Sequence, residues 1–408
     1  MVMLISTRGL ILTTILAGLI GCQSNAAISS IVEPTMIHAI DELQITSKPT
    51  LTSIITTTPP PPPTDTAIPT ITATIEKVHF GPDRFPKGIN PFTGLKVNDL
   101  AILDRRPVMV KVSNFPPSGR PQFGLSLADL VFEYYIGEGM NRFSAIFFGQ
   151  KPEKVGPVRS ARLADIQLAS MYQTIFAFAS ADPRVRNNLL TELDGLSIIV
   201  RESTCPALCD TGAHTVNSVF ADISKFDAYA KAKGINNYRQ IINGMVFDSI
   251  LADNNLTPVE SLLIRYNDLN QSEWRYDISS KKYLRWTESN IPETPVKLVP
   301  LEDKLTGKQL AFDNIILLYA RYNEYNPTLH NIELWANRDG RKANFFRDGK
   351  MISGFWRTPA TNLPLEFFDN SGKSIPLKPG NSWFIILGQD STIDQPKPGQ
   401  WKVQFAIS

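Results

Sequence analysis

The segment from Gly156 to Arg162 carries the residues best suited to bind an anion. Its sequence is Gly-Pro-Val-Arg-Ser-Ala-Arg, and a further arginine lies upstream at position 142. A guanidinium group is a planar fork of donors that matches the oxygens of a carboxylate or a phosphate. In the alternative interpretation, these arginines pair with Asp129 and Glu133 in an internal ion network. We expect, near the start of the following helix, an anion-binding site made of Arg142, Arg159, Ser160 and Arg162.

A second chemistry, general acid–base catalysis, would depend on His214. It is one of only four histidines and could act as a base beside Glu133 or Asp129, although a surface or capping role is the plainer interpretation. Asp129 and Glu133 flank the start of an expected strand, where four residues span about 13 Å. That spacing exceeds the separation of about 5–9.5 Å that glycosidases use, so these two alone do not predict a glycosidase. No known hydrolase, phosphate-loop or dinucleotide motif is present, so catalysis stays open and binding is favoured.

Cys22 follows a short hydrophobic leader and is a candidate for lipid attachment. The leader, residues 1–21, contains Arg8 and an apolar run of eleven residues from Leu10 to Ile20. A membrane-spanning helix needs about 20 such residues, so this run is typical of an export signal. Its end, Leu-Ile-Gly-Cys at positions 19–22, resembles the lipobox of bacterial lipoproteins. We therefore predict acylation of Cys22 and an extracytoplasmic protein anchored to the cell membrane.

The two other cysteines, Cys205 and Cys209, stand four positions apart. Because export usually leads to an oxidising compartment, a disulfide between them is favoured. Free thiols are the first alternative. A metal pair is the second, but zinc normally takes four ligands and the nearby His214 does not complete such a set. We predict no metal and no cofactor.

Composition bounds the remaining classes of function. Apolar residues make up 43% of the chain, which is enough to bury a sizeable core. The net charge is only +2 and no basic run is present, so a nucleic-acid partner is not supported. Residues 22–84 are rich in Thr and Pro, including five consecutive prolines from Pro59 to Pro63. Such a run cannot pair as a helix or a sheet, so we predict an extended, disordered stalk over residues 22–84.

The elements that must position these residues mix strands with helices over residues 85–245. Apolar, β-branched runs predict strands at 107–112, 130–136, 142–148, 174–180 and 197–201. Helical spacing predicts helices at 164–173, 183–190 and 222–233, the last ended by Gly234. We expect a layered α/β domain of sheet and helix here.

Residues 246–408 differ, with many short apolar or aromatic runs separated by turns such as Asp348-Gly349. We expect a mainly β domain, so that the whole chain is of mixed α/β class. All six tryptophans of the chain lie in this half. Five of them could form a core or a sugar-binding surface, of which core packing is the more frequent use; they are Trp274, Trp286, Trp335, Trp356 and Trp383.

Several stretches together resemble the YerB-like lipoprotein family, a two-domain bacterial family of uncharacterised activity. They lie at 90–95 (NPFTGL), 120–125 (RPQFGL), 128–133 (ADLVFE), 156–162 (GPVRSAR), 346–350 (FRDGK) and 377–383 (LKPGNSW). The resemblance covers about residues 89 to 405 and implies a lipoprotein with a layered architecture of packed sheets and helices. Two loops depart from the family pattern, at 179–185 after Phe178 and at 213–215 around His214.

These observations lead to one preferred function and two alternatives. We expect a surface lipoprotein that binds a polar, anionic ligand or partner of the cell envelope. The first alternative is an envelope hydrolase that uses His214 with Glu133 or Asp129. The second is a scaffold that docks another envelope protein. The sequence does not predict the oligomeric state.

Overall fold

The computed structural model describes residues 78–213, 215–251, 256–291 and 293–407, all within one compact unit. The leader, Cys22, stalk residues 22–77 and His214 lie outside the described residues, so the expectations about them remain predictions. Within those described ranges, no helix is both long enough and apolar enough to cross a membrane.

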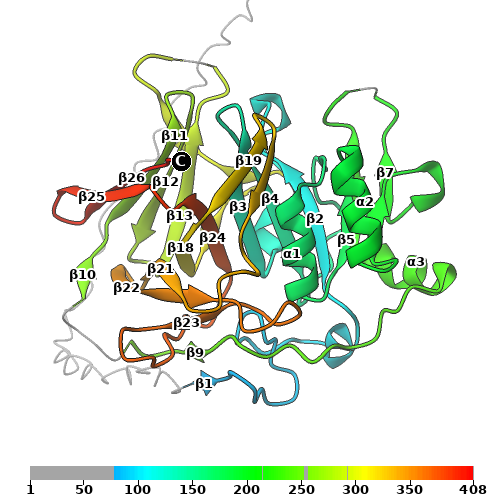
Figure 1. The fold of residues 1–408 in the computed structure, drawn as a ribbon, viewed down its shortest axis with the longest axis horizontal. Helices are drawn as coiled ribbons and strands as arrows, with labels where there is room; N and C mark the ends of the chain where they lie inside the picture. The colour runs from blue at the N-terminus through cyan, green and yellow to red at the C-terminus, as the bar shows by residue number, and fades with distance from the viewer. Residues whose placement is uncertain (1–77, 214, 252–255, 292, 408) are drawn as a thin grey trace, which may run out of the picture. The chain divides into compact units, whose positions relative to one another are not determined.

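One large sheet of eleven strands runs through the molecule and takes strands from both halves of the chain (Figure 1). In spatial order it contains β10 (Thr257–Pro258), β22 (Lys350–Arg357), β21 (Arg341–Arg347), β18 (Asn314–Ala320), β24 (Ser382–Gly388), β3 (Leu130–Gly137), β4 (Met140–Phe147), β2 (Val108–Ser113), β5 (Ile175–Phe178) and β6 (Ser197–Ile199), and β23 (Glu366–Phe368) pairs with β22.

The centre of this sheet is parallel and buried on both faces. Strand β24 pairs in parallel with β18 on one side and with β3 on the other. The sequences of β18 and β24, NIILLYA and SWFIILG, are almost continuously apolar and every residue in them is buried. Such runs are typical of central parallel strands, which have no solvent-facing side. Strands β2, β3, β5, β6, β18 and β24 therefore all end at one edge, which we call the carboxyl edge.

A second sheet packs against one face of the large sheet through an aromatic core. It contains β14 (Leu298–Pro300), β13 (Lys282–Glu288), β12 (Asn270–Asp277), β11 (Ser261–Asn267), β26 (Gln400–Gln404) and β25 (Thr392–Lys397), with β17 (Ala311–Phe312) paired to β13. Trp274 of this sheet and Phe143 of β4 both contact the ring of Trp383, at centroid distances of 5.2 and 4.9 Å. These large rings are fully buried, so the two sheets share one hydrophobic core.

Helices cover part of the large sheet. They are α1 (Leu163–Met171), α2 (Pro183–Glu192) and α3 (Phe226–Lys233), and Figure 1 shows α1 in front of β4 and β2, with α2 in front of β5. Asp182 caps α2 through the backbone amide of Arg184, and Gly234 ends α3 with a φ of +67°. Three short hairpins complete the set: β7 (Leu208–Asp210) with β8 (Val219–Ala221), β15 (Glu302–Asp303) with β16 (Lys308–Gln309), and β19 (Tyr322–Asn326) with β20 (Leu329–Ile332).

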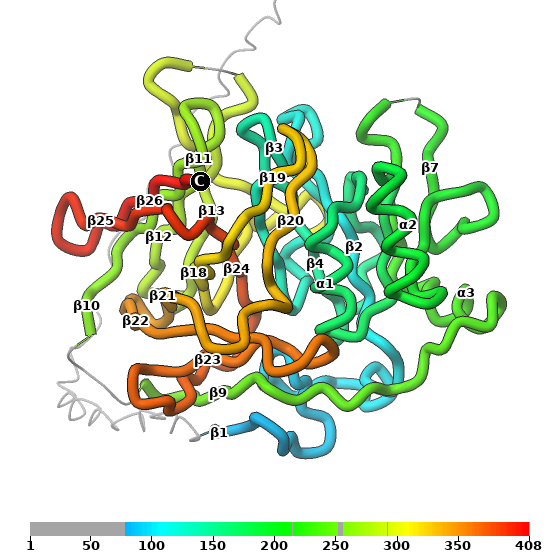
Figure 2. The backbone as a smooth tube through the Cα atoms, in the orientation of Figure 1, coloured from blue at the N-terminus to red at the C-terminus, as the bar shows by residue number. Residues whose placement is uncertain are grey.

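The predicted mixed class agrees with the structure in its coarse form, because both helices and strands are present. Strands nevertheless predominate over the described residues as a whole, so the fold is mainly β. The two predicted domains, 85–245 and 246–408, contribute neighbouring strands to one sheet, as the tube in Figure 2 shows where β24 lies between β18 and β3.

The described chain begins at the edge opposite the carboxyl edge. Strand β1 (His79–Phe80), which falls in the predicted stalk, pairs with β9 (Phe247–Asp248). The carbonyl of Asp248 accepts a hydrogen bond from Arg347, which is paired with Asn314, the first residue of β18. Strands β1 and β9 accordingly lie where the parallel strands start, at the bottom of Figure 1.

Candidate functional site

An extended segment enters the gap between β2 and β5 at the carboxyl edge. The two strands pair through residues 108–110 and 175–177, and beyond that point the chain at 157–161 lies between them. The amide of Arg159 donates to the carbonyl of Lys111 at 2.8 Å, and the carbonyl of Arg159 accepts from the amide of Ala179 at 3.0 Å. Because both sides of the segment are hydrogen-bonded, the backbone at Arg159 and Ser160 is held rigidly.

Two guanidinium groups meet at one carbonyl oxygen of this segment. Nη1 of Arg142 donates to the carbonyl of Ser160 at 3.0 Å, and Nη1 of Arg162 reaches the same oxygen at 3.4 Å. Arg142 stands on β4, where it is paired with Ser113 of β2 and Tyr134 of β3. Arg162 is the residue before α1, so side chains from a strand and from a helix start converge at Ser160.

Arg159 adds a third cation to this group, which we call the arginine cluster. Its Nη1 donates to the carbonyl of Val216, in the loop between β7 and β8, at 2.6 Å. Burial, helped by the neighbouring charges of Arg162 and Arg159, lowers the pKa of Arg142 to about 9. The three predicted arginines therefore lie close enough to repel one another.

The arginine cluster is not paired directly with carboxylates in the described part of the chain. Among the described residues, no carboxylate forms an ion pair with Arg142, Arg159 or Arg162, and the Nε atom of each is buried without a partner. Asp165 acts electrostatically on Arg142 and Arg162, and Asp182 acts on Arg162, but Asp165 is bound to Lys111 and Asp182 to Arg184. Arg142 is only 6% exposed. Buried cations without counter-ions are costly, so the geometry is suited to an anion that comes from outside.

Two serine hydroxyls lie beside the arginines. The Oγ atoms of Ser160 and Ser180 are 2.6 Å apart, with Ser160 half-buried and Ser180 exposed. In such a pair one hydroxyl donates to the other, which leaves one O–H free to donate outward. Ser160 was predicted from the sequence, whereas Ser180, just after β5, was not.

Beneath the cluster lies a fully buried polar group that sequence reasoning missed. Oδ1 of Asp165 accepts from Tyr134 Oη at 2.5 Å, from Ser144 Oγ at 2.6 Å and from Lys111 Nζ at 3.1 Å. Its Oδ2 accepts from the amide of Arg162 at 2.7 Å. Asp165 therefore links the buried lysine to the backbone that carries the arginine cluster.

Burial perturbs the titration of this group. It lowers the pKa of Lys111 to about 7, although the charge of Asp165 opposes the shift and Arg142 and Arg162 add to it. Burial, together with the charge of Asp165, raises the pKa of Tyr134 well above its usual value. Lys111 therefore changes charge near neutral pH. A charged residue inside the apolar run Val-Met-Val-Lys-Val was the sequence signal that could have revealed it.

Asp129 and Glu133 do not pair with the arginine cluster. The alternative prediction, an internal ion network of these carboxylates with the arginines, is therefore wrong for the described contacts. Asp129 accepts from the side chain of Asn90 and from the amides of Phe148 and Gly149, at the start of β3. These residues lie at the edge opposite the cluster.

Glu133 points to the other face of the sheet, because neighbouring strand residues alternate in direction. Its carboxylate accepts from Arg285 at 2.9 Å and from Trp383 Nε1 at 2.8 Å, between the two sheets. Both carboxylates are at most 5% exposed, and the structure does not bring them together as a catalytic pair.

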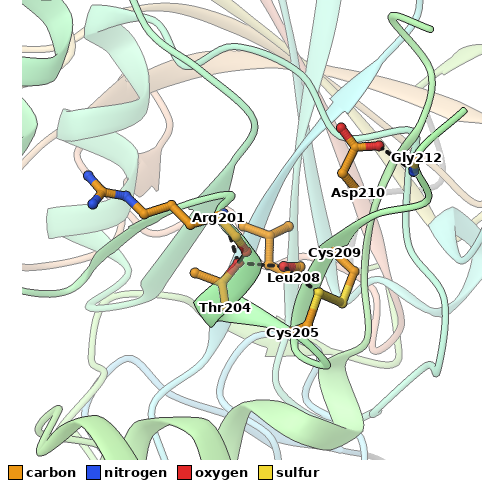
Figure 3. The surroundings of a disulfide bond; sticks show 7 residues. All are labelled: Arg201, Thr204, Cys205, Leu208, Cys209, Asp210 and Gly212. Carbon is orange, nitrogen blue, oxygen red and sulfur yellow. Dashed lines mark hydrogen bonds between the residues drawn. A yellow bond between two sulfur atoms is a disulfide. The ribbon is translucent and has the colours of Figure 1, made fainter. Parts of the chain in front are cut away.

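Cys205 and Cys209 are joined by a disulfide beside the β7–β8 hairpin, as Figure 3 shows. Thr204 Oγ1 donates to the carbonyl of Leu208 at 2.5 Å and closes the same short turn. The loop after β7 contains the position of His214 and the carbonyl of Val216 that binds Arg159. The disulfide therefore stands at the base of the hairpin whose loop borders the arginine cluster.

The remaining candidates are placed as follows. In the part of the chain that the structure describes, no group of three or more His, Cys, Asp or Glu residues could hold a metal ion. Trp274, Trp356 and Trp383 are fully buried, whereas Trp286 and Trp335 are half-buried. Three of the five tryptophans are thus core residues.

Comparison with known proteins finds one family that spans both halves of the chain. Its sequence models, described as the N-terminal and C-terminal domains of "Protein of unknown function (DUF3048)", match residues 92–236 and 262–384. A protein of Bacillus subtilis (strain 168) named "Putative lipoprotein YerB" is 30% identical over 321 residues, which are 75% of this chain and 88% of that protein. The crystal structure of the YerB protein from Bacillus subtilis matches with a TM-score of 0.60 and 27% identity, covering 74% of this chain and 96% of that one.

Proposed function

Since the chain belongs to the DUF3048 family, both domains of which it contains, we propose that it is an envelope lipoprotein that binds an anionic ligand through its arginine cluster. The observation that carries the proposal is the convergence of Arg142, Arg159 and Arg162 without an ion-pair partner among the described residues. Structural arginines in a fold are normally neutralised by carboxylates. An uncompensated group at a half-open edge is instead suited to an external anion.

The position of the cluster supports the same function. It lies at the carboxyl edge, where β2 and β5 separate and residues 157–161 enter between them. In sheets with parallel strands, ligands bind in the crevice outside the carboxyl ends, at a point where neighbouring strands diverge. The guanidinium and hydroxyl donors of the cluster lie at this edge, and such donors suit an oxyanion.

Membrane attachment is supported by the leader and by the relative. Leu19-Ile20-Gly21-Cys22 resembles a lipobox, and the Bacillus relative is named as a lipoprotein. Mass spectrometry of the mature N-terminal peptide should show diacylglycerol on Cys22. Replacement Cys22→Ser should prevent acylation and release the protein from the membrane fraction; retention there would contradict the anchor.

Binding is tested with the full-length protein in detergent micelles, by isothermal titration calorimetry with inorganic phosphate and with citrate. We expect at least one of these anions to bind and the double variant Arg159→Ala/Arg162→Ala to lose binding. Binding should weaken as sodium chloride rises, because salt screens charges that remain accessible to solvent.

The matched control is Arg338→Ala. Arg338 also donates from Nη1 to a backbone carbonyl, that of Thr358, but it lies outside the cluster. This variant should bind as the unchanged protein does. If neither anion binds, or if the double variant binds as well as Arg338→Ala, the proposed function is rejected.

A further inference from the structure

We propose that the arginine cluster binds the terminal phosphoryl group of a phosphate monoester, in preference to a carboxylate or a phosphate diester. The inference rests on the proposed function and names the chemical class of its ligand. Its basis is the number of cations, the kinds of donor and the separate elements that carry them.

The first argument is the charge that the site must receive. Arg142, Arg159 and Arg162 stand above Lys111, and among the residues that the structure describes the only carboxylate bound within this set is Asp165. A single carboxylate ligand carries one negative charge and is matched by one guanidinium fork. It would leave the other two arginines repelling each other. A phosphate monoester carries about −1.5 to −2 charges at pH 7, which matches the positive charge of the three arginines better.

The second argument is the spread of the donors. Arg142 projects from a strand, Arg159 from the inserted segment and Arg162 from the residue before α1. Arg142 and Arg162 donate to the carbonyl of Ser160, whereas Arg159 donates to that of Val216, so the three guanidinium groups come from separate elements. A planar carboxylate offers two oxygens in one plane, whereas a phosphoryl group offers three acceptor oxygens in a tetrahedral arrangement. Donors that come from three elements can bind together to the tetrahedral phosphoryl group, but not to the planar carboxylate.

The third argument is the hydroxyl pair. Ser160 and Ser180 share one hydrogen bond of 2.6 Å, so one O–H remains to donate to an oxyanion. Ser180 is exposed and lies between β5 and α2, on the open side of the cluster. A neutral hydroxyl donor next to guanidinium groups adds a hydrogen bond without adding charge, which suits an oxygen already contacted by arginine.

The helix N-termini are not needed for this inference. The first amides of α1 and α2 lie at the same edge, but Asp165 and Asp182 already bind backbone amides there. Attraction for the anion therefore comes from the side chains of the cluster. Arg142 is the informative residue, because it is 94% buried, its Nε has no partner, and its charge is not offset by an ion pair among the described residues.

The test compares four small anions on the full-length protein in micelles at constant ionic strength and pH 7.5. Calorimetry is run with inorganic phosphate, methyl phosphate, dimethyl phosphate and acetate. We expect inorganic phosphate and methyl phosphate to bind at least tenfold more tightly than dimethyl phosphate and acetate. Equal binding of acetate or dimethyl phosphate would overturn the phosphoryl inference while leaving the proposed function intact. Absence of binding by any anion, citrate included, would overturn both.

Conservative variants separate the donor geometry from simple loss of folding. Arg142→Lys keeps the charge but loses the planar fork and should weaken methyl phosphate binding at least tenfold, with acetate little changed. Ser180→Ala should weaken methyl phosphate binding severalfold, and Arg338→Ala should leave it unchanged. Thermal melting by circular dichroism checks that each variant is folded. If Arg142→Lys and Ser180→Ala melt normally and bind methyl phosphate fully, the inference fails.

The source of the phosphoryl group is then assigned with two further probes. One is glucose 6-phosphate in solution, and the other is vesicles of phosphatidylcholine containing phosphatidic acid. If either probe binds and inorganic phosphate displaces it, the inference is supported. Binding of glucose 6-phosphate identifies the source as a soluble ester, and binding of the vesicles identifies it as a membrane lipid. If neither probe binds, or neither is displaced by phosphate, the monoester assignment is wrong.

Discussion

Lys111 shows how one buried residue supports the arginine cluster above it. Its ammonium group is fully buried and contacts Tyr134, Ser144 and Asp165, with the Tyr134 ring at 3.8 Å from the nitrogen. Asp165 in turn accepts the amide of Arg162, so the four side chains form a network that reaches the site. A partly broken network of this kind is costly, because a low dielectric strengthens every unpaired charge.

The coupling between Lys111 and Asp165 gives a first prediction. Lys111→Met should lower the free energy of unfolding by about 2 kcal/mol, because it leaves the buried Asp165 without one of its hydrogen-bond donors. Lys111→Met/Asp165→Asn should recover part of that loss, since the remaining groups are neutral. Chemical denaturation of the single and double variants measures the effect. Losses that simply add would show that the two residues are not coupled.

A second prediction concerns pH and the same lysine. Its pKa is about 7 in the folded protein, against 10.5 as the ordinary value. Between these two values the unfolded chain binds the proton more often, so stability should rise with pH in that window. From pH 7 to pH 9 the free energy of unfolding should rise by about 2 kcal/mol. The rise is about 1.4 kcal/mol per pH unit once Lys111 of the folded protein has lost its proton.

The control for this prediction is Lys111→Met, in which every other titrating group remains. Guanidinium denaturation at pH 7 and pH 9 should show the rise in the unchanged protein and a smaller rise in the variant. An equal rise in both would assign the pH dependence to other groups.

The sequence could predict which site residues lie together where those residues are close in the chain. Arg159, Ser160 and Arg162 are neighbours in the chain, so their common location followed directly. Arg142 was also placed correctly beside them in space. The partners of Asp129 and Glu133 were not predictable, because they depend on which face each residue takes and on Trp383, which is 250 residues from Glu133.

At the scale of elements, the β7–β8 hairpin connects the disulfide to the site. Its strands pair over residues 208–210 and 219–221, and the loop between them provides the carbonyl that binds Arg159. Asn217, in the same loop, donates to Ser118 Oγ at 3.2 Å. Cys209 lies in β7, so the disulfide to Cys205 restrains the chain where the hairpin begins.

The third prediction is that removal of this cross-link lowers stability by about 2 kcal/mol, the lower end of the usual range, because Cys205 and Cys209 close a short loop. Cys205→Ser/Cys209→Ser should unfold at a lower denaturant concentration than the oxidised protein. Dithiothreitol should reproduce the shift in the unchanged protein and have no effect on the double variant. A double variant that is as stable as the oxidised protein would contradict the prediction.

The elements most accessible to sequence reasoning were those with strong local patterns. The strand at 130–136 corresponds to β3 (Leu130–Gly137), and the helices at 164–173 and 183–190 correspond to α1 and α2 within two residues at each end. The β7–β8 hairpin and the inserted segment at 157–161 were missed. Both are short and stabilised by contacts distant in sequence, which no local period records.

At the scale of the whole molecule, the two matched domains are joined within one sheet. Parallel strands β3 and β24 pair over Leu130–Tyr134 and Ser382–Ile386, and Arg285 of the second half neutralises Glu133 of the first. Local patterns could predict that both halves contain strands, but not that those strands would be neighbours. Which strands become neighbours depends on packing between residues about 250 positions apart in the chain.

The shared sheet gives a fourth prediction, for fragments. Residues 78–245 alone would expose the edge of β3 and leave the buried carboxylate of Glu133 without Arg285, so this fragment should be unfolded or insoluble. Co-expression with residues 246–408 should restore a soluble complex with the far-ultraviolet circular dichroism of the full unit. A monomeric, cooperatively melting fragment 78–245 would contradict this prediction.

The pairing of β1 with β9 has a consequence for orientation at the cell surface. Because β1 lies where the parallel strands start and the arginines lie where they end, the chain enters the described unit on the side opposite the arginine cluster. If Cys22 carries the proposed lipid, the tether therefore joins the domain away from the proposed ligand site, and it would not obstruct that site.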